Sequence, residues 1–119
     1  MSTIEAPTEV SPEDLAVKAA LKKIAKLFTD LSHPMRLKIV LLIADEGPTA
    51  PKDMWKPLNS TLGTVAYHVR ELEKMGLIVL HREDRVRGAV KHTYKLTARG
   101  RNTVKLMKEW AVARSQEES

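Results

Sequence analysis

Residues 60–78 read STLGTVAYHVRELEKMGLI, and this stretch decides the fold. Its apolar side chains recur at intervals of three and four residues, which is the period of one face of an α-helix. These side chains are Leu62, Val65, Val69, Leu72 and Met75. Gly76 follows at the position where a helix end favours a residue in the left-handed conformation. The pattern predicts a helix over 62–75.

The opposite face of this helix is polar. With the apolar side chains turned toward a core, this face holds Ser60, Thr64, Tyr67, His68 and Glu71. A helix that reads DNA must bury one face and present the other to the major groove. Thr64 and His68 can donate and accept hydrogen bonds, and Tyr67 can donate to a phosphate or pack on a thymine methyl group. These side chains are the candidates for contact with base edges.

Residues next to that face are candidates for contact with the phosphate backbone. Ser60 and Thr61 bring hydroxyl groups and backbone N–H groups to the start of the helix, where an anion is favoured. Arg70 and Lys74 lie at the edge of the face. Glu71 either accepts a hydrogen bond from a cytosine or pairs with a basic neighbour such as Lys74.

A β-hairpin is predicted directly after the helix. Two β-favouring runs, Leu77–Arg82 and Ala89–Leu96, flank a charged tip at Glu83–Gly88. Four basic side chains lie on or near this tip: Arg82, Arg85, Arg87 and Lys91. A basic hairpin can lie along the DNA backbone or enter the minor groove. Arg85 and Arg87 are the strongest candidates for that contact.

The remaining elements are helical, so the fold class is mainly α with one β-hairpin and about five helices. Ser11 caps a first helix that continues to Leu31, and a buried second helix begins at Pro34 and stops at Gly47. A short helix is expected around Lys52 to Lys56. Thr97 caps the last helix.

This order of elements is that of a winged helix-turn-helix domain, and the residues also resemble a family. The stretches LSHPMRLKIVLLI at 31–43, STLGTVAYHVRELEKMGLI at 60–78 and HTYKLTARG at 92–100 resemble the ArsR-type bacterial and archaeal regulators. The resemblance implies a DNA-binding transcriptional regulator with a recognition helix at 62–75 and a wing at 82–91. Repression is the favoured outcome.

The resemblance also implies a homodimer, which two recognition helices on adjacent half-sites would require. The terminal helices are the expected interface, because they carry more apolar surface than one small domain should leave exposed. The candidate interface residues are Leu21, Phe28, Val104, Met107, Trp110 and Ala111. The alternative is that both helices only complete the core of the monomer.

Composition agrees with a polyanionic partner. The chain has 119 residues, with 20 Lys and Arg against 15 Asp and Glu, and both ends are acidic, so the centre is the more basic part. We expect one domain over 11–113, a disordered lead-in at 1–10 and a flexible tail at 114–119. No apolar run approaches the ~20 residues of a membrane span, and the N-terminus lacks a signal peptide's pattern. The cytoplasm is therefore the expected location.

Other classes of function find little support. The chain has no cysteine, and the last helix lacks the His and carboxylate pairs with which many ArsR-type relatives sense metals. No metal or cofactor is predicted, and the effector is open. His81 and His92 would form a two-ligand site if they lay opposite each other in the hairpin. No catalytic constellation is present. The competing hypothesis is a winged-helix module that binds protein through Trp55, Trp110 and the apolar last helix.

Overall fold

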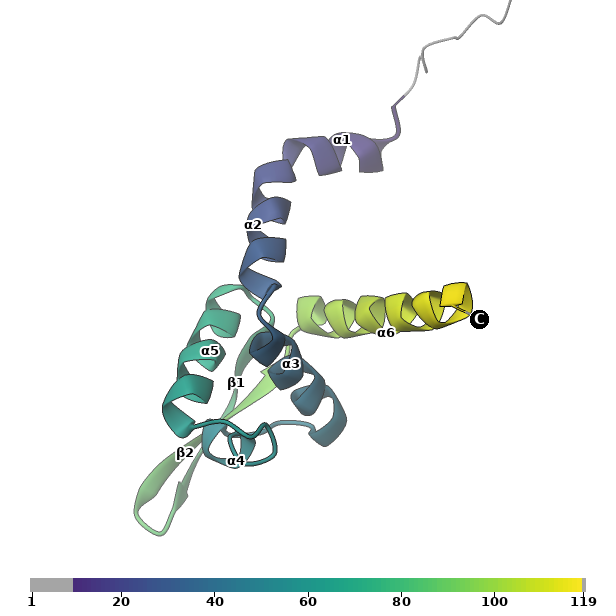
Figure 1. Ribbon diagram of the computed structural model, residues 1–119. Helices are drawn as coiled ribbons and strands as arrows, with labels where there is room; N and C mark the ends of the chain where they lie inside the picture. Colours follow the sequence, from purple (N-terminus) through teal and green to yellow (C-terminus); the bar gives the residue numbers. More distant parts are fainter. Residues whose placement is uncertain (1–9, 119) are drawn as a thin grey trace, which may run out of the picture. The chain divides into compact units, whose positions relative to one another are not determined.

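The computed structural model describes residues 10–118, which form six helices and one two-stranded antiparallel sheet (Figure 1). The described chain separates into two compact units, one ending at Leu31 and the other beginning at Ser32. The single domain over 11–113 that the sequence predicts stays a prediction. The predicted lead-in at 1–10 lies outside the described residues, apart from Val10.

The first unit contains α1 (Pro12–Ala19) and α2 (Leu21–Leu31). Ser11 caps α1 as expected, because its side-chain oxygen accepts from the backbone N–H of Asp14 at 3.1 Å. The single helix predicted from Ser11 to Leu31 is wrong, since the helix is interrupted at Ala20, where φ is −101° and ψ is 9°. Nothing in the local sequence explains this break. Neither α1 nor α2 contains a buried residue.

The second unit opens with three helices that build its core. They are α3 (Pro34–Glu46), α4 (Pro51–Met54) and α5 (Leu62–Lys74). α3 ends at Gly47, whose φ of 80° is open to glycine at little cost. The buried apolar side chains of this unit are Ile39, Val40, Ile43, Ala50, Met54, Val65, Val69, Leu72, Leu77, Ile78 and Val104. The short helix expected at 52–56 is present, but it lies slightly earlier in the chain.

The hairpin is longer than predicted. It consists of β1 (Ile78–Val86) and β2 (Ala89–Leu96), paired from Ile78 opposite Leu96 to Val86 opposite Ala89. The expected tip at 83–88 is thus mostly strand, because an exposed ladder needs only backbone pairing and no buried face. The turn has two residues, Arg87 and Gly88, with φ values of 54° and 81°. Positive φ at both positions is the geometry of a type I′ turn, whose twist matches that of the strands.

A junction joins the end of α5, the start of β1 and the start of α6 (Ala98–Glu118). The Thr97 hydroxyl donates to the carbonyl of Gly76 at 2.6 Å and accepts from the N–H of Gly100 at 3.1 Å, so it caps α6 as predicted. The Thr97 N–H donates to the carbonyl of Leu77 at 3.0 Å. α5, the hairpin and α6 are therefore joined by one group of hydrogen bonds around Thr97.

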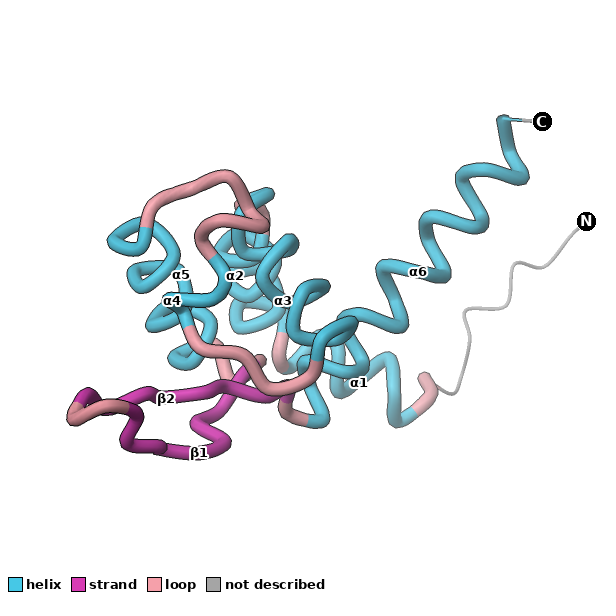
Figure 2. Tube along the Cα trace, turned by 90° about the horizontal axis from the view of Figure 1, so that it is seen from below, coloured by secondary structure: helices cyan, strands magenta, loops and turns pink. Residues whose placement is uncertain are grey.

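α6 is longer than expected. It runs through Glu118, where the sequence predicted a flexible tail from 114. The hairpin tip and the C-terminal end of α6 point in opposite directions from the core of this unit (Figures 1 and 2). Among the described residues, no helix combines the length and apolarity needed to cross a bilayer.

We expect Gly100→Ala to destabilise the protein by about 1–3 kcal/mol, the range for overpacked sites. A Cβ at Gly100 would overlap the carbonyl oxygen of Leu77, which is backbone and cannot rotate away. Urea unfolding measures the effect. Gly63→Ala in α5 is the matched control, because a Cβ there meets nothing within 4 Å. That variant should be as stable as the parent, or more stable by up to about 1 kcal/mol. Equal stability of both variants would contradict the packing of the junction.

Candidate nucleic-acid interface

The turn before α5 fixes where the helix begins. Asn59 adopts a φ of 52°, and the N–H of Ser60 donates to the carbonyl of Trp55 at 2.8 Å. Thr61 is the N-cap: its hydroxyl oxygen accepts from the N–H of Thr64 at 3.2 Å and donates to the hydroxyl of Thr64 at 3.0 Å. Ser60 is half-buried, while Thr61 and Thr64 are exposed. The hydroxyl groups predicted to meet phosphate or base edges thus also define the first turn.

α5 has the two faces that the sequence predicted, with one exception. Val65, Val69 and Leu72 are buried, whereas Leu62 leaves 48% of its surface exposed. Leu62 is the first residue of the helix, one turn before the first buried position, where the core no longer covers it. Its assignment to the core is wrong. It adds an apolar side chain to the exposed start of the helix.

The polar face is also confirmed only in part. Tyr67 is 48% exposed, and Arg70 and Lys74 are exposed as expected. Lys74 Nζ lies 3.3 Å from Glu71 Oε2, so the predicted alternative in which Glu71 pairs with Lys74 is present in the structure.

His68 is turned partly inward rather than fully exposed. The Nε–H of Arg36 in α3 donates to its Nδ1 at 3.1 Å, and Arg36 is only 5% exposed. The rings of Tyr67 and His33 lie 5.1 and 5.8 Å from the His68 ring, measured between centroids. Arg36 also lies 5.9 Å from the centre of the Tyr67 ring. The sequence did not single out Arg36, because Lys38 lies in the same helix and a cation there is not distinctive.

The side chain of His33 does not cap α3. It occupies the N-cap position, but its ring makes no capping hydrogen bond. The start of α3 relies instead on Pro34, whose missing N–H needs no partner. The His33 ring is thereby left beside His68.

The wing, which is the hairpin of β1 and β2, carries two kinds of cation. Arg82 Nε lies 2.7 Å from Asp84, and Lys91 Nζ lies 2.7 Å from Asp53 in α4. These ion pairs neutralise the charges of two of the four basic side chains that were predicted to contact DNA. The pair between Lys91 and Asp53 also links the wing to α4. Arg85 and Arg87 are exposed and form no ion pair within the part of the chain that the structure describes. Their charges remain available at the tip.

The hairpin does not bring His81 and His92 opposite each other. His92 pairs with Glu83, and its Nε2 lies 3.6 Å from that carboxylate. The ladder shifts register between Leu80 and Arg82, which leaves His81 in the irregularity. The conditional two-ligand site is therefore not assembled, and the described residues contain no cluster of three metal-binding side chains.

The candidate dimer residues differ in exposure. Val104 is only 6% exposed because it belongs to the core of the second unit, so its assignment to an interface is wrong. Trp110 is 64% exposed, Met107 is half-buried and Ala111 is exposed on the same helix. In the first unit, Leu21 and Phe28 are each more than half exposed on α2.

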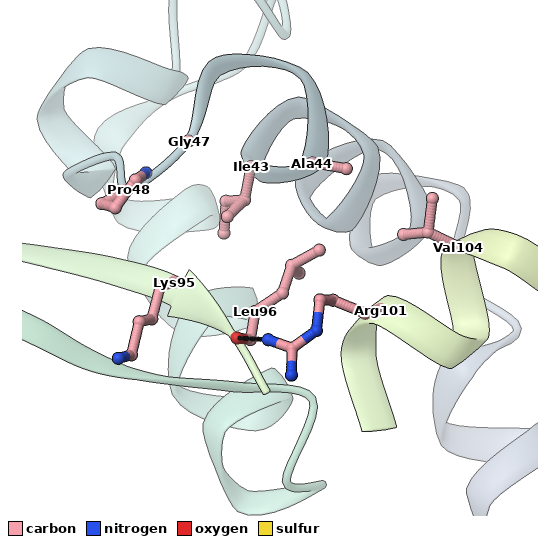
Figure 3. Close-up of a pocket in the computed structure, with 8 residues that line it drawn as sticks. All are labelled: Ile43, Ala44, Gly47, Pro48, Lys95, Leu96, Arg101 and Val104. Carbon is pink, nitrogen blue, oxygen red and sulfur yellow. Dashed lines mark hydrogen bonds between the residues drawn. The ribbon is translucent and has the colours of Figure 1, made fainter. Parts of the chain in front are cut away.

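A groove of about 380 Å³ lies between the end of α3, the end of β2 and the start of α6 (Figure 3). Ile43 and Leu96 point toward each other across it. The Arg101 guanidinium donates to the carbonyl of Leu96 at 3.2 Å, while the Lys95 ammonium points away. A small-molecule site requires polar groups that converge on one point. This groove does not provide them.

Known proteins share this arrangement of helices. Residues 31–81 match a family described as a helix-turn-helix domain, and this range covers α3, α4 and α5. The chain has the winged helix-turn-helix fold. No curated protein sequence matches it. The fold class predicted from the sequence agrees with the solved structures that resemble this chain.

Three solved structures of proteins described as transcriptional regulators illustrate the similarity. The homodimeric DNA-binding domain Mb0332 from Mycobacterium bovis, described as a possible ArsR-family regulator, is 21% identical, with a TM-score of 0.65 over 92% of this chain and 91% of that one. The repressor BigR from Xylella fastidiosa is 23% identical, with a TM-score of 0.65 over 87% and 96%. A transcriptional regulator homologue from Pyrococcus horikoshii is 25% identical, with a TM-score of 0.61 over 82% and 97%.

The electrostatics of His68 give this protein a pH dependence. Burial lowers the pKa of His68 below its ordinary value of 6.5, the charges of Arg36 and His33 lower it further, and Glu71 opposes them. The unfolded state therefore binds the proton more readily than the folded state. We expect the free energy of unfolding to fall as the pH drops below about 6.5 and to be insensitive to His68 above it.

Urea unfolding between pH 5 and 8, compared with the non-titrating His68→Asn variant, measures this contribution. The parent should show the steeper loss toward acid. His81→Asn, in the wing, is the matched control and should keep the parental slope. Identical slopes for the parent and His68→Asn would contradict the environment assigned to His68.

Proposed function

We propose that this winged helix-turn-helix protein is a sequence-specific transcriptional regulator that binds double-stranded DNA as a homodimer, with α5 in the major groove. The observation that carries the proposal is the polar, exposed face of α5 in the same unit as a wing tip that bears two unpaired arginines. A protein that reads DNA needs both a base-contacting element and cations that neutralise phosphate.

α5 offers a mixed contact surface. Thr64 and Tyr67 supply hydroxyl groups near the start and middle of the helix, and Leu62 supplies an exposed apolar side chain of the kind that packs on a thymine methyl group. Ser60 and Thr61 lie at the helix N-terminus, where backbone N–H groups and the helix dipole favour phosphate. Arg70 lies at the edge of the face and contacts the backbone.

The wing contributes through its tip. Arg85 and Arg87 are the phosphate or minor-groove contacts, because no ion pair among residues 10–118 neutralises their charges. Arg82 and Lys91 serve mainly to shape and anchor the hairpin, since each is held by a carboxylate at 2.7 Å. The wing is therefore attached to the helical core through Lys91 and Asp53, and its unpaired cations lie at the tip.

Dimerisation through the terminal helices is part of the proposal. Leu106 and Trp110 lie one turn apart on α6 and are both exposed, so they form an apolar surface that the second unit does not cover. On α2, Leu21 and Phe28 are also exposed and share one helix face. A two-fold dimer buries such faces and places two recognition helices on half-sites about one helical turn apart. The description of Mb0332 as homodimeric supports this arrangement.

Repression is the favoured regulatory outcome, as in the relative described as a transcriptional repressor. A bacterial or archaeal regulator of this type would act in the cytoplasm, where the chromosome lies. The competing hypothesis of a protein-binding module has weaker support at Trp55, which is half-buried and has the Lys56 ammonium 5.3 Å from the centre of its ring. Trp110 fits either hypothesis.

We expect selection from a random pool of duplexes to recover a motif with two-fold symmetry. Two identical protomers related by a two-fold axis read two identical half-sites, so the symmetry also tests the dimer. Affinity for the recovered duplex should fall with salt at a log–log slope near about −5 if about six phosphates are contacted. Absence of enrichment at low salt would instead favour the protein-binding module.

We expect the double variant Arg85→Gln, Arg87→Asn to bind duplex DNA more weakly than the parent. The second change keeps the left-handed turn, because Asn–Gly is favoured in type I′ turns. The salt slope should become shallower by about 0.9 for each lost phosphate contact, with weaker binding to the recovered and to unrelated duplexes. Lys105→Gln on α6, which points away from the wing, is the matched control and should leave the slope unchanged. A double variant with parental affinity and slope would remove the wing from the interface.

A further inference from the structure

The hydrogen bond between Arg36 and His68 constrains the chemistry of the recognition helix. Arg36 lies in α3, is 5% exposed and donates its Nε–H to His68 Nδ1 at 3.1 Å. No buried side-chain nitrogen or oxygen in the described chain lacks a hydrogen-bond partner. The guanidinium therefore belongs to a satisfied network, in which His68 is the member that lies on the candidate DNA-binding helix.

The donor and acceptor roles in this pair are fixed by chemistry. A guanidinium has only N–H donors and does not lose its proton in proteins. The ring nitrogen that faces it must therefore offer a lone pair, so Nδ1 carries no hydrogen. A neutral imidazole with a bare Nδ1 carries its single hydrogen on Nε2.

We propose that Arg36 is a specificity-determining positioning residue, which holds His68 as the Nε2–H tautomer so that α5 presents a hydrogen-bond donor, and never an acceptor, at this position of the major groove. The inference rests on the proposed function, because it concerns the base that the helix reads. Arg36 itself touches no DNA in this scheme. It acts through the ring that it orients.

The surroundings of the ring support a single orientation. The Tyr67 ring meets the His68 ring edge-on, with 5.1 Å between centroids and 65° between planes. The His33 ring lies on another side at 5.8 Å. Rotation of His68 by half a turn would place a carbon in front of the Arg36 Nε–H and leave that buried donor without its acceptor, which is costly. The charged form is also disfavoured, because it would put a second N–H against Arg36.

A fixed donor has a defined preference among bases. In the major groove, guanine offers N7 and O6 as acceptors, adenine offers N7 and thymine offers O4, whereas cytosine offers only an amino donor. His68 should therefore select one acceptor in each half-site and disfavour cytosine at that position. A histidine that is free to change tautomer could accept from cytosine as well.

The first test reads the tautomer directly. Ring nitrogen chemical shifts of His68, measured by NMR in the uniformly ¹⁵N-labelled protein at pH 7, should show a protonated Nε2 and an unprotonated Nδ1. In Arg36→Met, the His68 pKa should rise toward 6.5 and the tautomers should mix. If Arg36→Met does not fold, the parental spectrum still decides the question. A parental Nδ1–H tautomer would overturn the proposal.

The second test locates the base. In the duplex recovered by selection, single acceptors are removed one at a time: N7 with 7-deazapurines, O6 with 2-aminopurine, and O4 with a thymine analogue that lacks it. We expect one position in each half-site at which the loss weakens the parent by about 3- to 10-fold, the range of one hydrogen bond.

The variant His68→Asn separates the outward contact from the inward one. The Asn carbonyl oxygen occupies the place of Nδ1 and still accepts from Arg36, but the side chain ends before the position of Nε2. Removal of the critical acceptor should therefore cost this variant nothing further. His81→Asn, in the wing irregularity, is the control and should keep the parental sensitivity.

The outcomes are distinguishable. If the parent enriches no duplex, the proposed function fails. If it binds DNA with a symmetric motif but His68→Asn keeps the parental sensitivity at every acceptor, the function stands and the role of Arg36 and His68 is refuted. Loss of sensitivity at one acceptor in His68→Asn, together with the Nε2–H tautomer, supports the proposal.

Discussion

Burial of one side of α5 is the constraint on which the rest of the structure depends. Val65, Val69 and Leu72 are at most 2% exposed, and burying side chains of this size stabilises a fold by about 1.5–3 kcal/mol each. Rotation of the helix about its axis would return them to water. Because they hold the helix in one orientation, the face that carries Thr64, Tyr67 and Arg70 is exposed, and His68 lies at the boundary with α3.

The same residues that end this helix also set the hairpin. Gly76 has a φ of 75°, its carbonyl accepts from the Thr97 hydroxyl, and Leu77 begins the run into β1. The hairpin is held a second time near its base, where Thr49 and Tyr94 exchange backbone hydrogen bonds of 2.9 and 3.1 Å. These two attachments fix the base of the wing next to α5, so both candidate DNA contacts belong to the same compact unit.

Much of this fold could be predicted, because the regular spacing of apolar residues shows which face of a helix is buried. This spacing identified α5, while start and stop residues indicated α3 and the Thr97 cap, and β-favouring runs indicated the hairpin. It could not show that Leu62 extends beyond the core or that Val104 lies within it, since apolar residues alone do not reveal where packing ends. The pairing of Arg36 with His68 was equally hidden, because the two residues are 32 positions apart and meet only through tertiary packing.

Because the turn at Arg87 and Gly88 has only two residues, the reach of the wing depends on the length of its two strands. Each strand residue adds about 3.3 Å of reach and alternates between faces. Lengthening both strands together by two residues would move the tip outward and keep its side chains on their original faces. An insertion in only one strand would turn the cations beyond it to the other side. Evolution can therefore change the span of this arm only in paired steps, unless a bulge such as the one near His81 absorbs the odd residue.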